Sequence, residues 1–139
     1  QFTLGVMYRL GQGVPQDYAE AMKWYRLAAD QGNAKAQNNL GVGYENGQGV
    51  PQDYTEAMKW WRLAADQGDA DAQNNLGYMF FKGQGVPRNY DRAYRWITLA
   101  AAQGNEKAAK GLQILEQEMT PAQITEAQRL AREWKGKGK

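Results

Sequence analysis

The sequence contains no cysteine, no histidine and no serine. These absences exclude disulfides, thiolate nucleophiles, Ser–His triads, imidazole bases and the usual zinc ligands together. No stretch approaches the ~20 consecutive apolar residues that span a bilayer, so membrane insertion is not expected. Chemistry would have to come from Asp, Glu, Lys, Arg, Tyr and Thr alone. We therefore expect no enzyme, no cofactor and no metal site, and a hydrolase stays a remote alternative.

The charge balance also argues against a nucleic-acid partner. The 139 residues include 17 Lys and Arg against 15 Asp and Glu, a net charge of +2 at pH 7. Three of the lysines, Lys135, Lys137 and Lys139, lie at the extreme C-terminus, so the rest of the chain is close to neutral. A broad basic face is not expected from that balance.

A period of 36 residues runs through most of the chain. Leu-Gly pairs recur at positions 4, 40 and 76, Val-Pro pairs at 14, 50 and 86, and tryptophans at 24, 60 and 96. The pattern within each unit predicts two helices separated by a loop rich in Gly and Pro, so the predicted fold class is all-α. The predicted single domain, 1–139, comprises repeat 1 (1–32), repeat 2 (33–68), repeat 3 (69–104), a partial repeat 4 (105–119), a capping helix (120–134) and a flexible basic tail (135–139).

Capping residues predict where the helices begin and end. We expect Asn33 to cap the first helix of repeat 2 and Gly47 to end it in a left-handed turn. Asp53 then caps the second helix, and Glu56 would complete a capping box. Repeat 1 has the same pair, whereas Arg92 replaces the acid in repeat 3, so only half of the device is expected there.

The helical glycines and the chain ends carry further expectations. Glycine at positions 5, 41 and 77 predicts a close approach of two helices beneath a large tryptophan. The run Thr120-Pro121-Ala122-Gln123 predicts a last helix that covers the edge of the repeats. Gln1 aligns with the glutamines at 37 and 73, which predicts a first repeat truncated at its N-terminal end.

The repeated pattern Leu-Gly-x-x-Tyr…Gly-x-Gly-Val-x-x-Asp-Tyr-x-x-Ala-x-x-Trp-x-x-x-Ala-Ala-x-Gln-Gly resembles the Sel-one-like repeat (SLR), a relative of the tetratricopeptide repeat. The resemblance covers residues 1 to about 115. It implies a right-handed α/α superhelical solenoid of antiparallel helix pairs. It also implies a non-catalytic scaffold or adaptor for other proteins. It further implies a bacterial protein. Periplasm or secretion is favoured over cytoplasm, and the compartment is left open.

Partner-binding residues are expected where near-identical repeats differ, because packing positions must repeat and ligand-facing positions need not. In a tetratricopeptide-like superhelix, such positions on the first helix of each repeat line the concave groove. Ordinary repeat drift on a solvated surface is the alternative interpretation. The predicted groove residues are Val6, Arg9, Asn38, Val42, Glu45, Asn74, Tyr78, Phe81, Lys82 and Lys110.

Two other patterns favour structural roles. The tryptophans at 24, 60 and 96 could stack a sugar or choline, but they share a stripe with small alanines, which favours a place in the core. The Gly-x-Gly segments follow helices and lack a Lys-Ser/Thr ending, which favours turns over phosphate loops.

We therefore expect an interaction module that binds a peptide or protein surface in its groove. The alternative is a structural segment of a longer array or oligomer, with self-association through the truncated N-terminal end.

Overall fold

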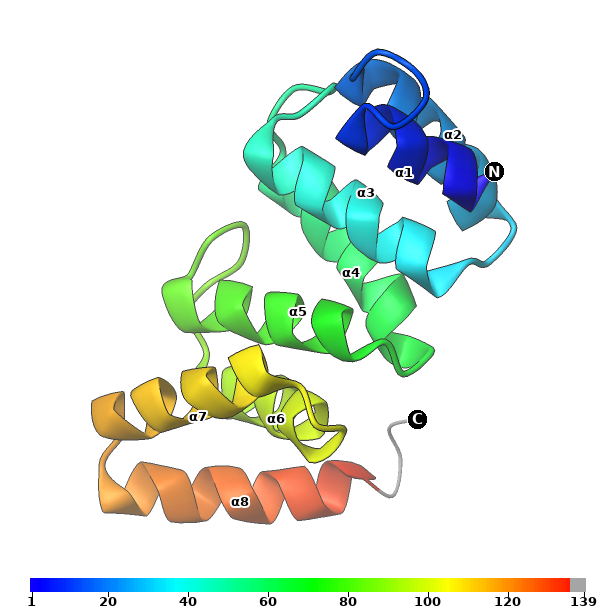
Figure 1. Ribbon diagram of the computed structural model, residues 1–139. Helices are drawn as coiled ribbons and strands as arrows, with labels where there is room; N and C mark the ends of the chain where they lie inside the picture. The colour runs from blue at the N-terminus through cyan, green and yellow to red at the C-terminus, as the bar shows by residue number, and fades with distance from the viewer. Residues whose placement is uncertain (136–139) are drawn as a thin grey trace. The chain divides into compact units, whose positions relative to one another are not determined.

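The computed structural model describes residues 1–135, and every regular element in that range is a helix (Figure 1). The predicted all-α class is therefore confirmed. The tail predicted over residues 135–139 lies outside the described residues, apart from the backbone of Lys135. The helices are α1 (Phe2–Leu10), α2 (Tyr18–Asp30), α3 (Ala34–Asn46), α4 (Tyr54–Asp66), α5 (Ala70–Lys82), α6 (Tyr90–Ala102), α7 (Glu106–Glu118) and α8 (Pro121–Lys135).

The predicted caps hold the helix ends. The Asn33 side chain accepts a hydrogen bond from the Ala36 amide at 2.9 Å and starts α3. Gly47 ends α3 with a φ of 68°, the left-handed conformation that glycine adopts without a steric penalty. At the start of α8 the full capping box forms, because the Thr120 and Gln123 side chains each accept from the other's backbone amide.

The capping box expected at Asp53 and Glu56 is only half made. The Asp53 side chain accepts from the Glu56 amide at 3.1 Å, as predicted. The Asp53 amide, however, donates to the carbonyl of Tyr44 in α3 at 2.9 Å, so it needs no return bond from Glu56. The Glu56 carboxylate lies 3.5 Å from the Lys59 ammonium instead. The prediction of a complete box was wrong because the backbone of the preceding helix supplies the acceptor.

All three repeats use this backbone bond between the cap and the first helix. The equivalent donors in repeats 1 and 3 are Asp17, which donates to Tyr8, and Asn89, which donates to Phe80. Repeat 3 therefore loses nothing where Arg92 stands in place of the acid. Its cap still accepts from the Arg92 amide at 3.0 Å.

The helical glycines mark the close approach of paired helices. A Cβ added at Gly5 would lie 2.7 Å from the Tyr25 ring, and one at Gly41 would overlap the Trp61 indole. At Gly77 the obstructing group is the side chain of Ile97, at 2.6 Å. The predicted close packing is confirmed. The large group is a tryptophan only in repeat 2, and it comes from the position after the repeated tryptophan.

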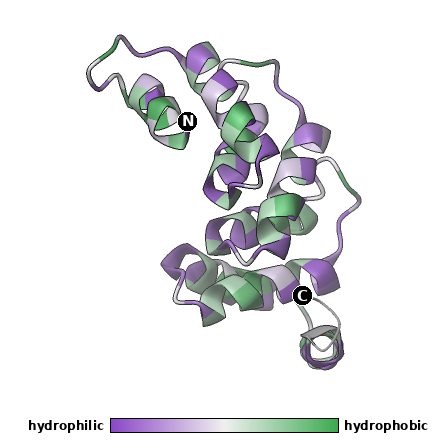
Figure 2. Ribbon diagram, turned by 90° about the vertical axis from the view of Figure 1, so that its right-hand side faces the viewer, coloured by the Kyte–Doolittle hydropathy of each residue, from purple (hydrophilic) through white to green (hydrophobic). Residues whose placement is uncertain are grey.

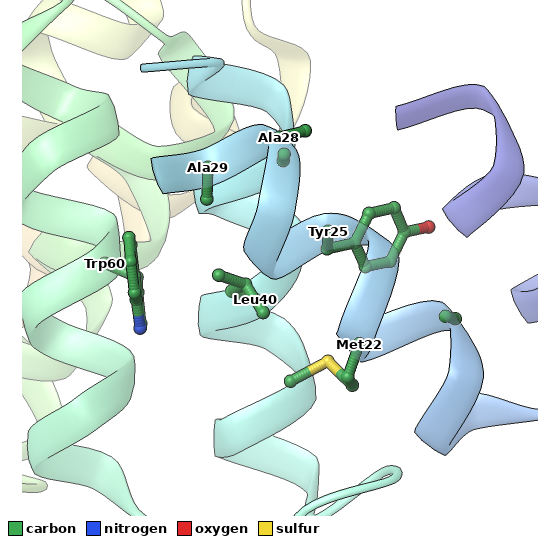
Figure 3. Close-up of a cluster of buried hydrophobic side chains, with 8 residues drawn as sticks. Met22, Tyr25, Ala28, Ala29, Leu40 and Trp60 are labelled. Atoms are coloured by element: carbon green, nitrogen blue, oxygen red, sulfur yellow. The ribbon is translucent and has the colours of Figure 1, made fainter. Parts of the chain in front are cut away.

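The chain divides into two compact units, and the first comprises residues 1–64. In this unit α2 packs against both α1 and α3. Figure 3 shows part of its core, a cluster of buried side chains that includes Met22, Tyr25, Leu40 and Trp60. Each helix carries both apolar and polar residues (Figure 2), as expected when one face of a helix is buried.

The second unit begins at Ala65. Here α6 packs against α5, α7 and α8, so it forms the centre of the unit. Its core includes the fully buried side chains of Met79, Leu115 and Ala127. The side chain of Gln103 donates to that of Gln73 at 2.8 Å and ties the α6–α7 loop to α5.

The repeated tryptophans lie in the core at two of three positions. Trp60 is 4 % exposed and Trp96 is similarly buried, whereas Trp24 is half-buried. The guanidinium of Arg26 lies over the Trp60 ring, 5.2 Å from its centroid. A ring covered in this way has no free face for a sugar, so the core interpretation holds for Trp60.

Replacing Trp60 with Ala should lower the free energy of unfolding by about 3–5 kcal/mol, because it empties a large aromatic site in the core. Chemical denaturation followed by circular dichroism measures the loss. Leu63→Ala is the control, because Leu63 lies on the same helix but is 45 % exposed. A loss below about 1 kcal/mol for Trp60→Ala would place this ring at the surface.

Replacing Ala127 with Asp should destabilise the second unit by about 2 kcal/mol or more, because it buries an unpaired carboxylate where α8 contacts the core. The neighbouring Gln128 is exposed, so Gln128→Asp makes the same charge change without burial. Thermal melts of the two variants give the comparison. Equal melting temperatures would show that α8 contributes nothing to the packing of this unit.

Candidate partner-binding surface

Two aromatic side chains on α5 lie together at the surface of the second unit. Tyr78 is 45 % exposed and Phe81 is half-buried, and their ring centroids are 6.3 Å apart. Phe81 also lies 5.9 Å from the ring of Tyr90, the first residue of α6. The three rings form a continuous series from α5 to the start of α6.

Cationic side chains flank this series of rings. The Lys82 ammonium lies 5.4 Å from the centroid of Tyr78. The Arg88 guanidinium lies 5.8 Å from the centroid of Tyr90 and donates to its hydroxyl at 3.4 Å. The other repeats have glutamine at the position of Arg88. The surface therefore combines apolar area with positive charge at its edge.

The adjacent helix α7 extends the apolar area. Ile114 lies 36 positions after Tyr78, at the same place in the repeat, and is 53 % exposed. Helices α5 and α7 contact each other, so the two positions lie on neighbouring helices of one unit. Lys110, also on α7, is exposed, and Asn74 at the equivalent position of α5 is half-buried. We call Tyr78, Phe81, Tyr90 and Ile114 the aromatic strip.

Sequence reasoning missed two members of this strip. Tyrosine also occurs at the equivalent positions 18 and 54, so position 90 is not one where the repeats differ. Ile114 lies in the partial fourth repeat, where the pattern breaks off. Extending the 36-residue period from Tyr78 by one more unit would have found it.

The other predicted groove residues lie in the first unit, and they differ in exposure. Val6 is half-buried and packs against the core, and Val42 is half-buried. Arg9 is exposed, and its Nε donates to the Tyr25 hydroxyl at 3.0 Å. Glu45 is half-buried, and its carbonyl accepts from the side chain of Gln52.

The structure corrects the prediction that Asn38 lies on an open groove face. Only 8 % of this residue is exposed, so its amide does not face solvent. Trp61 explains the position, because its indole Nε1 donates to the Asn38 carbonyl at 3.2 Å and the large ring packs onto this part of α3. Asn38 thus belongs to the packing between α3 and α4.

The described residues contain no arrangement typical of metal chemistry. Within residues 1–135, no group of three or more acidic side chains is placed to hold a metal ion. In the same range, none of the helices has the length and the apolar character needed to cross a membrane.

The repeats and their helix pairs match a known family. The Sel1 repeat family matches residues 1–33, 34–69 and 70–105. The chain belongs to the Sel1 repeat family. Sel1 repeat proteins are generally protein-interaction scaffolds, and the family is typically non-catalytic. No curated protein matches the sequence.

Two solved structures share the fold. One is a protective antigen present in uropathogenic Escherichia coli strains and displaying an SLR fold. It is 48 % identical, with a TM-score of 0.78 over 80 % of this chain and 24 % of that chain. The other, a Sel1 repeat protein from Oxalobacter formigenes, is 40 % identical, with a TM-score of 0.76 over 81 % of this chain and 46 % of that chain. This chain therefore spans less than half the length of either relative. Their fold confirms the predicted solenoid, and its handedness stays a prediction.

Burial raises the pKa of the Glu45 carboxyl above its usual range. The folded state then binds this proton more tightly than the unfolded state, so the carboxyl lowers stability as the pH rises through that range. Glu45→Gln should unfold at a slightly higher denaturant concentration than the parent at pH 7, and the gain should vanish at pH 3. Glu118→Gln, at an exposed position, controls for net charge. A gain of equal size at both pH values would contradict this origin.

Proposed function

We propose that this chain is a non-enzymatic scaffold whose second unit holds a peptide or protein surface against the aromatic strip. The observation that carries the proposal is the exposed aromatic and aliphatic area of Tyr78 and Ile114 on two adjacent helices. Contiguous exposed apolar areas mark interaction sites, and aromatic side chains such as tyrosine are common anchors for a partner. The membership of the Sel1 repeat family supports the same class of function.

The edge of the strip indicates the chemistry of the partner. Lys82 and Lys110 are exposed, and Lys82 and Arg88 lie over aromatic rings of the strip. A partner with an apolar side chain between acidic residues complements both features. The apolar contact supplies affinity, and the charges favour correct orientation and fast association. The half-buried amide of Asn74, on the same helix as Tyr78, is a candidate for a contact with partner backbone.

Replacing both Tyr78 and Phe81 with Ala should weaken partner binding by roughly 30-fold or more, because truncated aromatic anchors commonly cost 2 kcal/mol or more. A partner isolated with the parent chain from a bacterial lysate is titrated against parent and variant. The melting temperature should change little, because Tyr78 is largely exposed and Phe81 partly so. Ile114→Ala should weaken binding in the same direction by a smaller factor.

The control for this experiment is Leu63→Ala, which removes an equally exposed side chain in the first unit. A melt that collapses in the double variant would assign the two rings to the core. An unchanged affinity with an intact melt would place the partner elsewhere on the chain.

A further inference from the structure

The first unit contains a hollow of about 220 Å³ between α1, α2, α3 and the loop that follows α3. Its floor includes the buried residues Ala21, Met22 and Gly43. Polar side chains from other elements line it too, among them Arg9 of α1 and Asn39 of α3. The hollow thus joins an apolar floor to a polar wall.

Gly43 makes room for the Met22 side chain at the floor of this hollow. A Cβ added at Gly43 would run into the sulfur of Met22 and lie 2.7 Å from its terminal methyl carbon. Repeats 1 and 3 have methionine at this position, and Met79 in repeat 3 is fully buried. The Met22 side chain lies against the bare backbone of Gly43, and both residues line the hollow.

A tethered cation lies at the wall of the hollow. Among the described residues that line it, Arg9 is the only charged one. The Tyr25 hydroxyl accepts from the Arg9 Nε at 3.0 Å, and Tyr25 is itself buried, so this bond fixes the guanidinium. Among residues 1–135, no carboxylate pairs with Arg9, and the remaining guanidinium N–H groups are available to an acceptor.

The differences between repeats 1 and 2 gather at this place. The two repeats differ at only seven positions in 36. Three of those seven differences involve a residue that lines the hollow: Gly43 against Met7, Arg9 against Glu45, and Tyr25 against Trp61. Arginine thus occurs together with the tyrosine that holds it. Repeat 2 has neither the cation nor the hydroxyl.

We infer that this hollow receives the side chain of an aspartate or glutamate from a bound protein, with its carboxylate on the Arg9 guanidinium. The hollow is smaller than small-molecule sites, which measure about 300–1,000 Å³, so its volume suits one side chain. Two N–H groups of a held guanidinium match the two oxygens of a carboxylate. The inference rests on the proposed scaffold function, but it concerns the first unit and none of the residues of the aromatic strip.

The test is a titration of the full chain followed by NMR, with the backbone amide of Gly43 as reporter. The probes are N-acetyl-glutamate amide, N-acetyl-glutamine amide, N-acetyl-glutamine with its free terminal carboxylate, and inorganic phosphate. We expect a saturable shift with the glutamate probe and at least tenfold weaker binding of the other three. Arg9→Gln should weaken binding of the glutamate probe by about tenfold or more.

The matched control is Arg132→Gln, which makes the same substitution at an exposed position of α8. This variant should bind the glutamate probe as the parent does. Equal shifts with the glutamate and glutamine probes, tighter binding of phosphate or of the terminal carboxylate, no saturable shift with the glutamate probe, or an unchanged titration in Arg9→Gln would each overturn the inference. Because the probes carry no apolar anchor, the outcome is independent of whether Tyr78 and Phe81 bind a partner.

Discussion

The contact between a helical glycine and a large side chain of the paired helix sets the spacing within each helix pair. At Gly41 no other residue fits, because its Cβ would occupy the same space as the Trp61 indole. The indole nitrogen donates to the Asn38 carbonyl, so the ring is held by polar as well as apolar contacts. Tyrosine and isoleucine stand at the position of Trp61 in the other two repeats. The glycine is kept there, and the helices can still approach closely.

A backbone bond adds a second constraint that does not depend on side chains. In each repeat the amide of the cap residue donates to a carbonyl near the end of the first helix, as Asp53 does to Tyr44. This bond closes the Gly- and Pro-rich loop onto the pair and satisfies a donor that would otherwise need a partner. Side chains such as Arg92 can therefore vary at the third helical position without loss of the helix start.

The 36-residue period predicted the helices well because caps and turns are local. Asn33 and Gly47 have the conformations that their sequence neighbours predict. The side-chain environment could not be predicted in the same way. Asn38 is buried because the Trp61 ring of another helix packs onto this part of α3. The residue spacing within the first helix alone does not indicate that contact. Ile114 was missed because its repeat breaks off, although its position on the helix still follows the period.

Repetition itself explains how one fold provides two chemically different surfaces. Positions that meet identical neighbours in every repeat are held by packing, so most change is confined to the remaining positions. In the first unit, three of the differences between repeats 1 and 2 lie at a hollow with a tethered arginine, and one of them is at the buried packing position of Tyr25. In the second unit, the position of Arg9 is occupied by Phe81, and an exposed tyrosine lies beside it on α5. The same position on the first helix therefore bears a cation in one unit and an aromatic ring in the other, while the glycine beneath it is unchanged.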